Sequence, residues 1–116
     1  MSLLILTAAD VSTITSSILP DELISLMAMV FFRLHHRHDV AMPHRATIAT
    51  SAYSALFMPA HLDGLGTAMK VVCIPSAGQQ QNGLPATILD FDEMTGSLRA
   101  VVNARALTAL RNAAGK

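Results

Sequence analysis

The amino-acid sequence predicts an α+β fold in which two N-terminal helices pack on a largely antiparallel mixed sheet. Apolar residues recur at near-helical spacing in the first third of the chain, and short apolar runs separated by turn residues follow Pro43. Helical patterns come first and strand patterns then follow one another directly, an order typical of α+β domains. A length of 116 residues favours a single core.

The first third of the chain is predicted to hold one strand and two helices. Their ranges are Leu3–Leu6, Ala8–Ile18 and Asp21–His36. Thr7 is expected to cap the first helix, because Asp10 stands three residues further on as a capping-box partner. Pro20 separates the two helices, and Asp21 is expected to cap the second.

The rest of the chain is predicted to be mainly strands. Their ranges are Thr47–Ser51, Ser54–Met58, Ala68–Ile74, Ala86–Phe91 and Leu98–Val102. Pro59 is expected to end the second of these strands, and the polar stretch Pro75–Gly83 to form a loop. Asp92–Gly96 is expected to be a hairpin turn, and the composition of Ala104–Ala114 predicts a final helix.

Composition excludes several classes of protein. Hydrophobic residues make up 52% of the chain and charged residues 14%, which argues against disorder and favours a surface covered by a partner or by a further domain. Membership of a hydrophobic oligomer explains the same composition. The formal net charge is zero and no basic stripe is present, so nucleic-acid binding has little support.

A membrane or secretory location is also not favoured. The apolar run Leu23–Leu34 is too short to span a bilayer and contains Arg33. The apolar N-terminus lacks a basic start, and Asp10 interrupts it early, so it is a poor signal peptide. The single cysteine, Cys73, excludes an internal disulfide and fits a reducing compartment. A cytoplasmic location is therefore expected.

Three basic residues are the candidates for chemistry: Arg45, Lys70 and Arg111. Strand alternation puts Lys70 on one face with Ala68 and Val72, so its side chain either enters a polar pocket or extends to the edge of the sheet. Two arginines and a lysine converging on one pocket would suit a carboxylate, and a lysine in an apolar site can act as an acid or base near neutral pH. The alternative is three unrelated solvated cations.

Histidines do not predict a metal site. The group comprises His35, His36, His38 and His44, with Arg37 among them. The first two are adjacent, so they point to different sides of a helix, and the arginine opposes a bound cation. Basic side chains at a helix C-terminus complement the helix dipole, which explains the cluster without a metal.

Six segments in one order resemble the N-terminal part of the ornithine cyclodeaminase/mu-crystallin family. They are Pro43-His44-Arg45, Leu56-Phe57-Met58-Pro59-Ala60, Met69-Lys70-Val71-Val72, Gly83-Leu84-Pro85-Ala86-Thr87, Asp92-Glu93-Met94-Thr95-Gly96 and Leu107-Thr108-Ala109-Leu110-Arg111-Asn112-Ala113-Ala114. Each segment alone is a weak indication, but six in sequence are specific. The two N-terminal helices also fit the start of a family member.

The resemblance implies roles for the basic residues. Arg45 matches the arginine that holds the substrate carboxylate, and Lys70 matches the catalytic lysine that touches the substrate and transfers a proton. Arg111 matches the hinge-helix arginine that reaches both the cofactor and the substrate carboxylate, and Thr87 is a further candidate contact to the cofactor. The family acts on small amino or imino acids with NAD or NADP, and its sheet also forms a homodimer.

Several residues depart from the family pattern. Asn112 replaces the usual threonine of the hinge helix, and Gly83–Pro85 stand where many members carry side chains near the nucleotide. Leu56 stands where members acting on ornithine place an acidic residue, so an apolar amino acid, a cyclic imine or a related imino acid fits better than ornithine. No Gly-x-Gly-x-x-Gly sequence occurs, and the glycine pair Gly64 and Gly66 has no phosphate-binding helix behind it.

Together these points predict a substrate-binding and dimerisation domain over residues 1–103 and a truncated hinge helix over residues 104–116. The dinucleotide-binding Rossmann domain is expected to be absent from this sequence. The chain is then a truncated member of an NAD(P)-dependent oxidoreductase family that includes amino-acid dehydrogenases, imine reductases and cyclodeaminases. We expect it to bind no cofactor and to be inactive by itself. The alternatives are a non-catalytic dimerising interaction module or a non-functional gene fragment.

Overall fold

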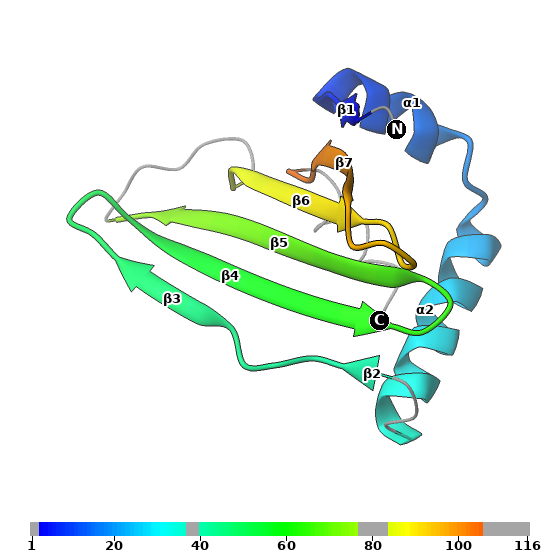
Figure 1. The fold of residues 1–116 in the computed structure, drawn as a ribbon. Coiled ribbons are helices and arrows are strands. Elements are labelled where there is room, and N and C mark those ends of the chain that lie inside the picture. The colour runs from blue at the N-terminus through cyan, green and yellow to red at the C-terminus, as the bar shows by residue number, and fades with distance from the viewer. Residues whose placement is uncertain (1–2, 37–39, 77–83, 106–116) are drawn as a thin grey trace.

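The fold is α+β, as predicted, and the described part of the chain forms two helices and a seven-stranded mixed sheet (Figure 1). A computed structural model describes residues 3–36, 40–76 and 84–105. The strands are β1 Leu4–Leu6, β2 Val40–Ala41, β3 Ala46–Ala49, β4 Tyr53–Leu62, β5 Gly66–Pro75, β6 Ala86–Phe91 and β7 Leu98–Asn103. Their order is β1-β7-β6-β5-β4-β2, and β3 also pairs with β4. Among the described strands, β1 and β7 pair in parallel and every other pair is antiparallel, so the sheet is largely antiparallel.

The helices begin where local capping allows. Helix α1 covers Ala8–Ser16, and Thr7 caps it through the predicted capping box, since the backbone N–H of Thr7 donates to the Asp10 carboxylate at 3.0 Å. Helix α2 covers Pro20–His36. The expectation that Asp21 caps α2 was wrong, because Pro20 is itself the first helical residue and Asp21 lies inside the first turn. Proline suits that position, where its fixed φ fits the helix and its missing N–H is not needed.

Strand β4 runs through Pro59, contrary to the prediction that this proline ends it. Residues Ser54–Phe57 pair with β3 on one side, and His61 and Leu62 pair with β2 on the same side. Between these two short strands, β4 has no described ladder partner on that side. Successive backbone N–H groups of a strand point to opposite neighbours, and the nitrogen of Pro59 points to this unpaired side. The proline therefore removes no hydrogen bond from the sheet.

The last predicted helix receives no support from the described residues. Ala104 continues the sheet, because its N–H donates to the Ala86 carbonyl at 3.0 Å, and Arg105 lies in a turn. The remainder of that helix, residues 106–114, lies outside the described residues, as does most of the predicted loop Pro75–Gly83.

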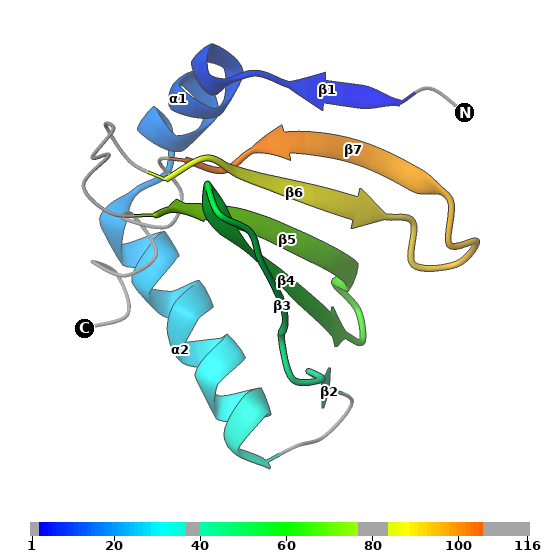
Figure 2. The same ribbon diagram turned by 90° about the vertical axis from the view of Figure 1, so that its left-hand side faces the viewer.

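The two faces of the sheet have different surroundings. Both helices lie on the same side of the sheet (Figure 2), and we call this side the helix-side face and the other the open face. A buried cluster of Val72, Ala86 and Ala104 lies on the helix-side face, with Met58 and Ile88 packed against it. Their register in β4, β5 and β6 places all five side chains on one face. The core of the domain therefore lies between the sheet and its helices.

Candidate functional site

Lys70 lies on the helix-side face, in the middle of the sheet. It is paired with Met58 of β4 on one side and with Ile88 of β6 on the other. Both neighbours pack against the buried cluster, and Lys70 itself is half-buried. The aliphatic part of the Lys70 side chain therefore lies among apolar side chains, as the sequence pattern predicted. It stands on the side of the sheet where the helices lie.

Arg45 stands close to the same row of residues. It directly precedes β3, whose first residue Ala46 is paired with Phe57, and continuing that register by one residue sets Arg45 beside Met58. Arg45, Met58, Lys70 and Ile88 would then form one cross-strand row. Arg45 is exposed, whereas Lys70 is half-buried. Met58 lies between Arg45 and Lys70 in this row, so their backbones are about 10 Å apart, a separation that two long basic side chains can bridge to bind one small anion such as a carboxylate.

The other two predicted contacts are not part of this row. Thr87 is paired with Val71 and Asn103, so strand alternation places it on the open face, opposite to Lys70. It is exposed there. Arg111 lies outside the described residues. The strand register thus sets Arg45 beside the row that contains Lys70 and places Thr87 on the opposite face of the sheet.

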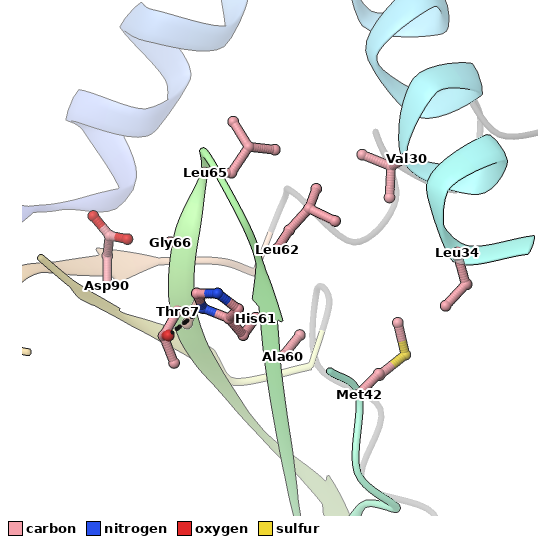
Figure 3. A pocket seen from close by; sticks show the side chains of 11 residues that line it. Val30, Leu34, Met42, Ala60, His61, Leu62, Leu65, Gly66, Thr67 and Asp90 are labelled. Carbon is pink, nitrogen blue, oxygen red and sulfur yellow. Dashed lines mark hydrogen bonds between the residues drawn. The ribbon is translucent and has the colours of Figure 1, made fainter. Parts of the chain in front are cut away.

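A cavity of about 230 Å³ opens beside the row that contains Lys70 (Figure 3). Its walls come from α2, from Met42 and from the β4–β5 hairpin. The lining residues are Val30, Leu34, Met42, Ala60, His61, Leu62, Leu65, Gly66, Thr67, Ala68 and Asp90. Most of these side chains are apolar, and Asp90 is the only carboxylate among them. The sequence pattern did not indicate this cavity, because it depends on how α2 packs across two strands.

Asp90 is held in an ion pair. The Arg99 guanidinium donates to its Oδ2 through Nε at 2.8 Å and through the terminal nitrogen at 2.7 Å. Asp90 is paired with Ala68 in β5, so it lies on the helix-side face one row away from Lys70. About a quarter of its side chain, 26%, is exposed. The cavity therefore carries a carboxylate whose charge is balanced locally.

A second polar cluster fixes the β4–β5 hairpin. One ring nitrogen of His61, Nδ1, lies 2.7 Å from Thr67 Oγ1, and the other, Nε2, lies 2.6 Å from Asp63 Oδ1. Arg33 of α2 donates to the Asp63 carbonyl at 2.6 Å. These contacts join α2 to the hairpin tip and so hold the walls of the cavity in place. Neither His61 nor Asp63 is among the candidate site residues that the sequence predicted.

The turn between β6 and β7 is stabilised by a carboxylate. The backbone N–H groups of Thr95 and Met94 each donate to Asp92 Oδ1 at 2.9 Å, and the Thr95 hydroxyl donates to it at 3.2 Å. These donors hold the pKa of Asp92 below its ordinary value, with the Thr95 N–H contributing most. Gly96 follows with φ of 77°, a left-handed conformation that glycine adopts without strain. The Asp92–Gly96 turn therefore forms as predicted.

The described part of the chain shows neither a cluster of metal ligands nor a single helix that could span a membrane. Among residues 3–36, 40–76 and 84–105, no group of three histidine, cysteine or acidic side chains is placed to hold a metal ion. Within the same residues no single helix is long and apolar enough to cross a bilayer. Helices α1 and α2 meet that length and composition only jointly, as a pair bent by 101°.

The fold is that of known enzymes over about a third of their length. An archaeal alanine dehydrogenase dimer with bound NAD matches 98% of this chain with a TM-score of 0.81 and 29% identity, and the match spans 35% of that structure. A Δ1-pyrroline-2-carboxylate reductase from Thermococcus litoralis, in complex with NADH and L-proline, matches 98% of the chain with a TM-score of 0.77 and 26% identity, over 35% of its own length.

A probable ornithine cyclodeaminase from Bordetella pertussis Tohama I has the same fold. It matches 97% of the chain with a TM-score of 0.78 and 21% identity, over 34% of its own length. No family model matches the sequence, and comparison with curated protein sequences gives no significant match. The likeness is thus strong in structure and weak in sequence, and this chain spans only about a third of each of these proteins.

Proposed function

We propose that this chain is the substrate-binding and dimerising part of an NAD(P)-dependent enzyme of the ornithine cyclodeaminase/mu-crystallin family, because it has the fold of about a third of each of several such enzymes. The substrate is a small amino or imino acid that carries a carboxylate. The observation that carries this proposal is the position of Lys70, which is half-buried on the helix-side face in the row that Arg45 adjoins.

Arg45 and Lys70 both contact the substrate carboxylate in this proposal, and Lys70 has a further task in proton transfer. The planar guanidinium of Arg45 binds and orients the substrate carboxylate. Lys70 stands between Met58 and Ile88 on the helix-side face, where its amine group can transfer a proton to or from a bound substrate. We propose that Lys70 moves a proton to or from the substrate nitrogen or an attached oxygen. Arg111 completes the carboxylate site in this hypothesis.

The nicotinamide would supply or accept hydride at the substrate carbon. The described residues do not provide a platform for a dinucleotide, since Gly64 and Gly66 form the hairpin turn between β4 and β5 and no phosphate-binding helix follows them. We propose that this chain by itself binds NADH and NADPH poorly, and that Thr87, on the open face, does not contact a nucleotide held near Lys70.

The substrate is expected to lack a distal positive charge. Leu56 is paired with Val72, one row from Lys70 on the helix-side face. A leucine there offers no carboxylate to a distal ammonium group, so ornithine would leave that charge without a partner. Apolar amino acids, cyclic imines and related imino acids fit this surface better.

The open face of the sheet is the proposed dimer interface. Strand register groups its apolar side chains in one area, and the described helices do not cover it. Its members include Ile5, Ile48, Phe57, Met69, Val71, Leu89 and Val101. Ile5 is 66% exposed and Ile48 is 56% exposed, which is costly for large apolar side chains unless a partner covers them.

Two measurements on the purified chain test the proposal. NMR titration with L-alanine and L-proline is expected to shift the resonances of Lys70 and its neighbours, and sedimentation is expected to give a dimer. A dimer that binds no amino acid would favour the alternative, a non-catalytic interaction module. A monomer that binds no amino acid would contradict both readings. Submicromolar binding of NADH by this chain would overturn the expectation of poor cofactor binding.

A further inference from the structure

The cavity beside Lys70 exists because its floor is made of small residues. Ala60 and Ala68 are paired directly in β4 and β5, and the next pair on the same face of the hairpin is Leu62 and Gly66. Neither alanine nor glycine fills the space above a sheet. Val30 and Leu34 of α2 close the opposite side (Figure 3), but the Arg33 contact to the hairpin tip holds the helix at a fixed distance.

The cavity is large enough to hold an organic side chain. Its volume is about 230 Å³. Apolar cavities of roughly 150 Å³ in proteins already hold a benzene-sized molecule. The walls contributed by Val30, Leu34, Met42 and Leu62 are apolar, so the cavity favours an aliphatic or aromatic group.

The cavity continues directly from the row of Lys70. Ala68 is two residues from Lys70 in β5, and Ala60 is two residues from Met58 in β4, so both alanines share the helix-side face with Lys70. Two residues along a strand span roughly 7 Å. A substrate whose carboxylate is held at Arg45 and Lys70 could therefore direct its side chain along the β4–β5 pair into the cavity.

The charge in the cavity restricts what it accepts. Asp90 borders the floor beside Ala68, but its carboxylate is neutralised by Arg99, whose guanidinium nitrogens lie 2.7 and 2.8 Å from Oδ2. A cationic side chain would have to compete with this guanidinium, and an anionic one would meet the carboxylate. An uncharged apolar side chain meets neither obstacle.

We propose that this cavity is the specificity pocket of the substrate site and receives the uncharged aliphatic side chain of an amino acid bound at Arg45 and Lys70. The proposal rests on the proposed function and adds to it the substrate class: amino acids with side chains longer than that of alanine. Ala60 and Ala68 are the residues that determine how long this side chain can be.

The test compares the binding of L-alanine, L-leucine and L-ornithine to the purified chain by NMR titration. Wild type is expected to bind L-leucine at least about tenfold more tightly than L-alanine, since each buried methylene adds affinity. Ala68→Leu and Ala60→Leu fill the floor and are expected to remove this preference for L-leucine over L-alanine. The control is Ala52→Leu, an exposed position at the β3–β4 turn, which should change neither affinity.

The outcomes separate the two proposals. Failure of wild type to bind any of the amino acids would contradict the proposed function and the pocket with it. Binding of L-alanine with no preference for L-leucine, or a preference that survives Ala68→Leu, would contradict only the pocket. If the leucine variants do not fold, nuclear Overhauser contacts in wild type decide. Contacts between the methyl groups of bound L-leucine and those of Ala60 and Ala68 would support the pocket, and their absence would refute it.

Discussion

Replacing Lys70 by methionine removes one positive charge from the helix-side face and keeps an unbranched side chain of similar reach. The flexible methionine can occupy the same space between Met58 and Ile88, next to the buried cluster. The variant therefore separates a functional role of the charge from a role in folding.

The structure sets the expected magnitudes. Volume-conserving apolar replacement at a half-buried position changes the free energy of unfolding by less than about 1.5 kcal/mol. A hydrogen bond to a charged group contributes about 1.5–3 kcal/mol. Loss of that interaction with a substrate carboxylate weakens binding about 10- to 150-fold, since about 1.4 kcal/mol corresponds to a factor of ten. Binding should therefore fall far more than stability.

The assay pairs urea unfolding with NMR titration by L-alanine and L-proline. The matched control is Arg105→Met, which removes a positive charge from an exposed turn position outside the row of Lys70. The control should keep wild-type affinity. Wild-type affinity in a folded Lys70→Met variant would refute the assignment of Lys70 to the substrate site, as would an equal loss of affinity in the control.

Three other predictions follow from the two faces and the β6–β7 turn. Arg45→Met should weaken amino-acid binding about tenfold or more in the same titration, while Arg45→Lys should recover only part of it because a lysine lacks the bidentate fork. Val71→Asp places a charge on the open face and should convert a dimer to a monomer in sedimentation, and an unchanged dimer would contradict that interface. The pKa of Asp92 is lowered in the folded state, so its stabilising contribution is present above the ordinary pKa and is lost as the pH falls through the lowered value. The stability difference between wild type and Asp92→Ala in urea unfolding should therefore shrink between neutral pH and pH values below about 3.8, and a constant difference would argue against it.

Local chemistry made most elements predictable. The capping box of Thr7 and Asp10 depends on residues three apart, and the turn held by Asp92 depends on the next three residues. Interactions over such short separations can be recognised from the sequence. The prediction for Pro59 was wrong because the effect of a proline depends on whether its nitrogen faces a paired strand. Strand β3 pairs with the part of β4 before Pro59 and β2 with the part after it, so Pro59 itself faces neither strand.

The candidate site was predictable only in part. Strand alternation was enough to group Lys70 with Ala68 and Val72, and the pairing of β5 with its neighbours confirms that they share one face. Alternation also separates Thr87 from Lys70, but only once the register of β6 against β5 is known. A shift of one residue would have reversed that result.

The sequence by itself determined which side chains share a face of each strand, because the two-residue period of a strand is a local property of the backbone. It also determined the Thr7 cap of α1 and the turn at Asp92. Only the tertiary structure decided that the helices cover the face of Lys70, that Arg45 adjoins its row, and that α2 leaves a cavity over Ala60 and Ala68. These features depend on strand register and helix packing between residues far apart in the chain, where many weak contacts act together.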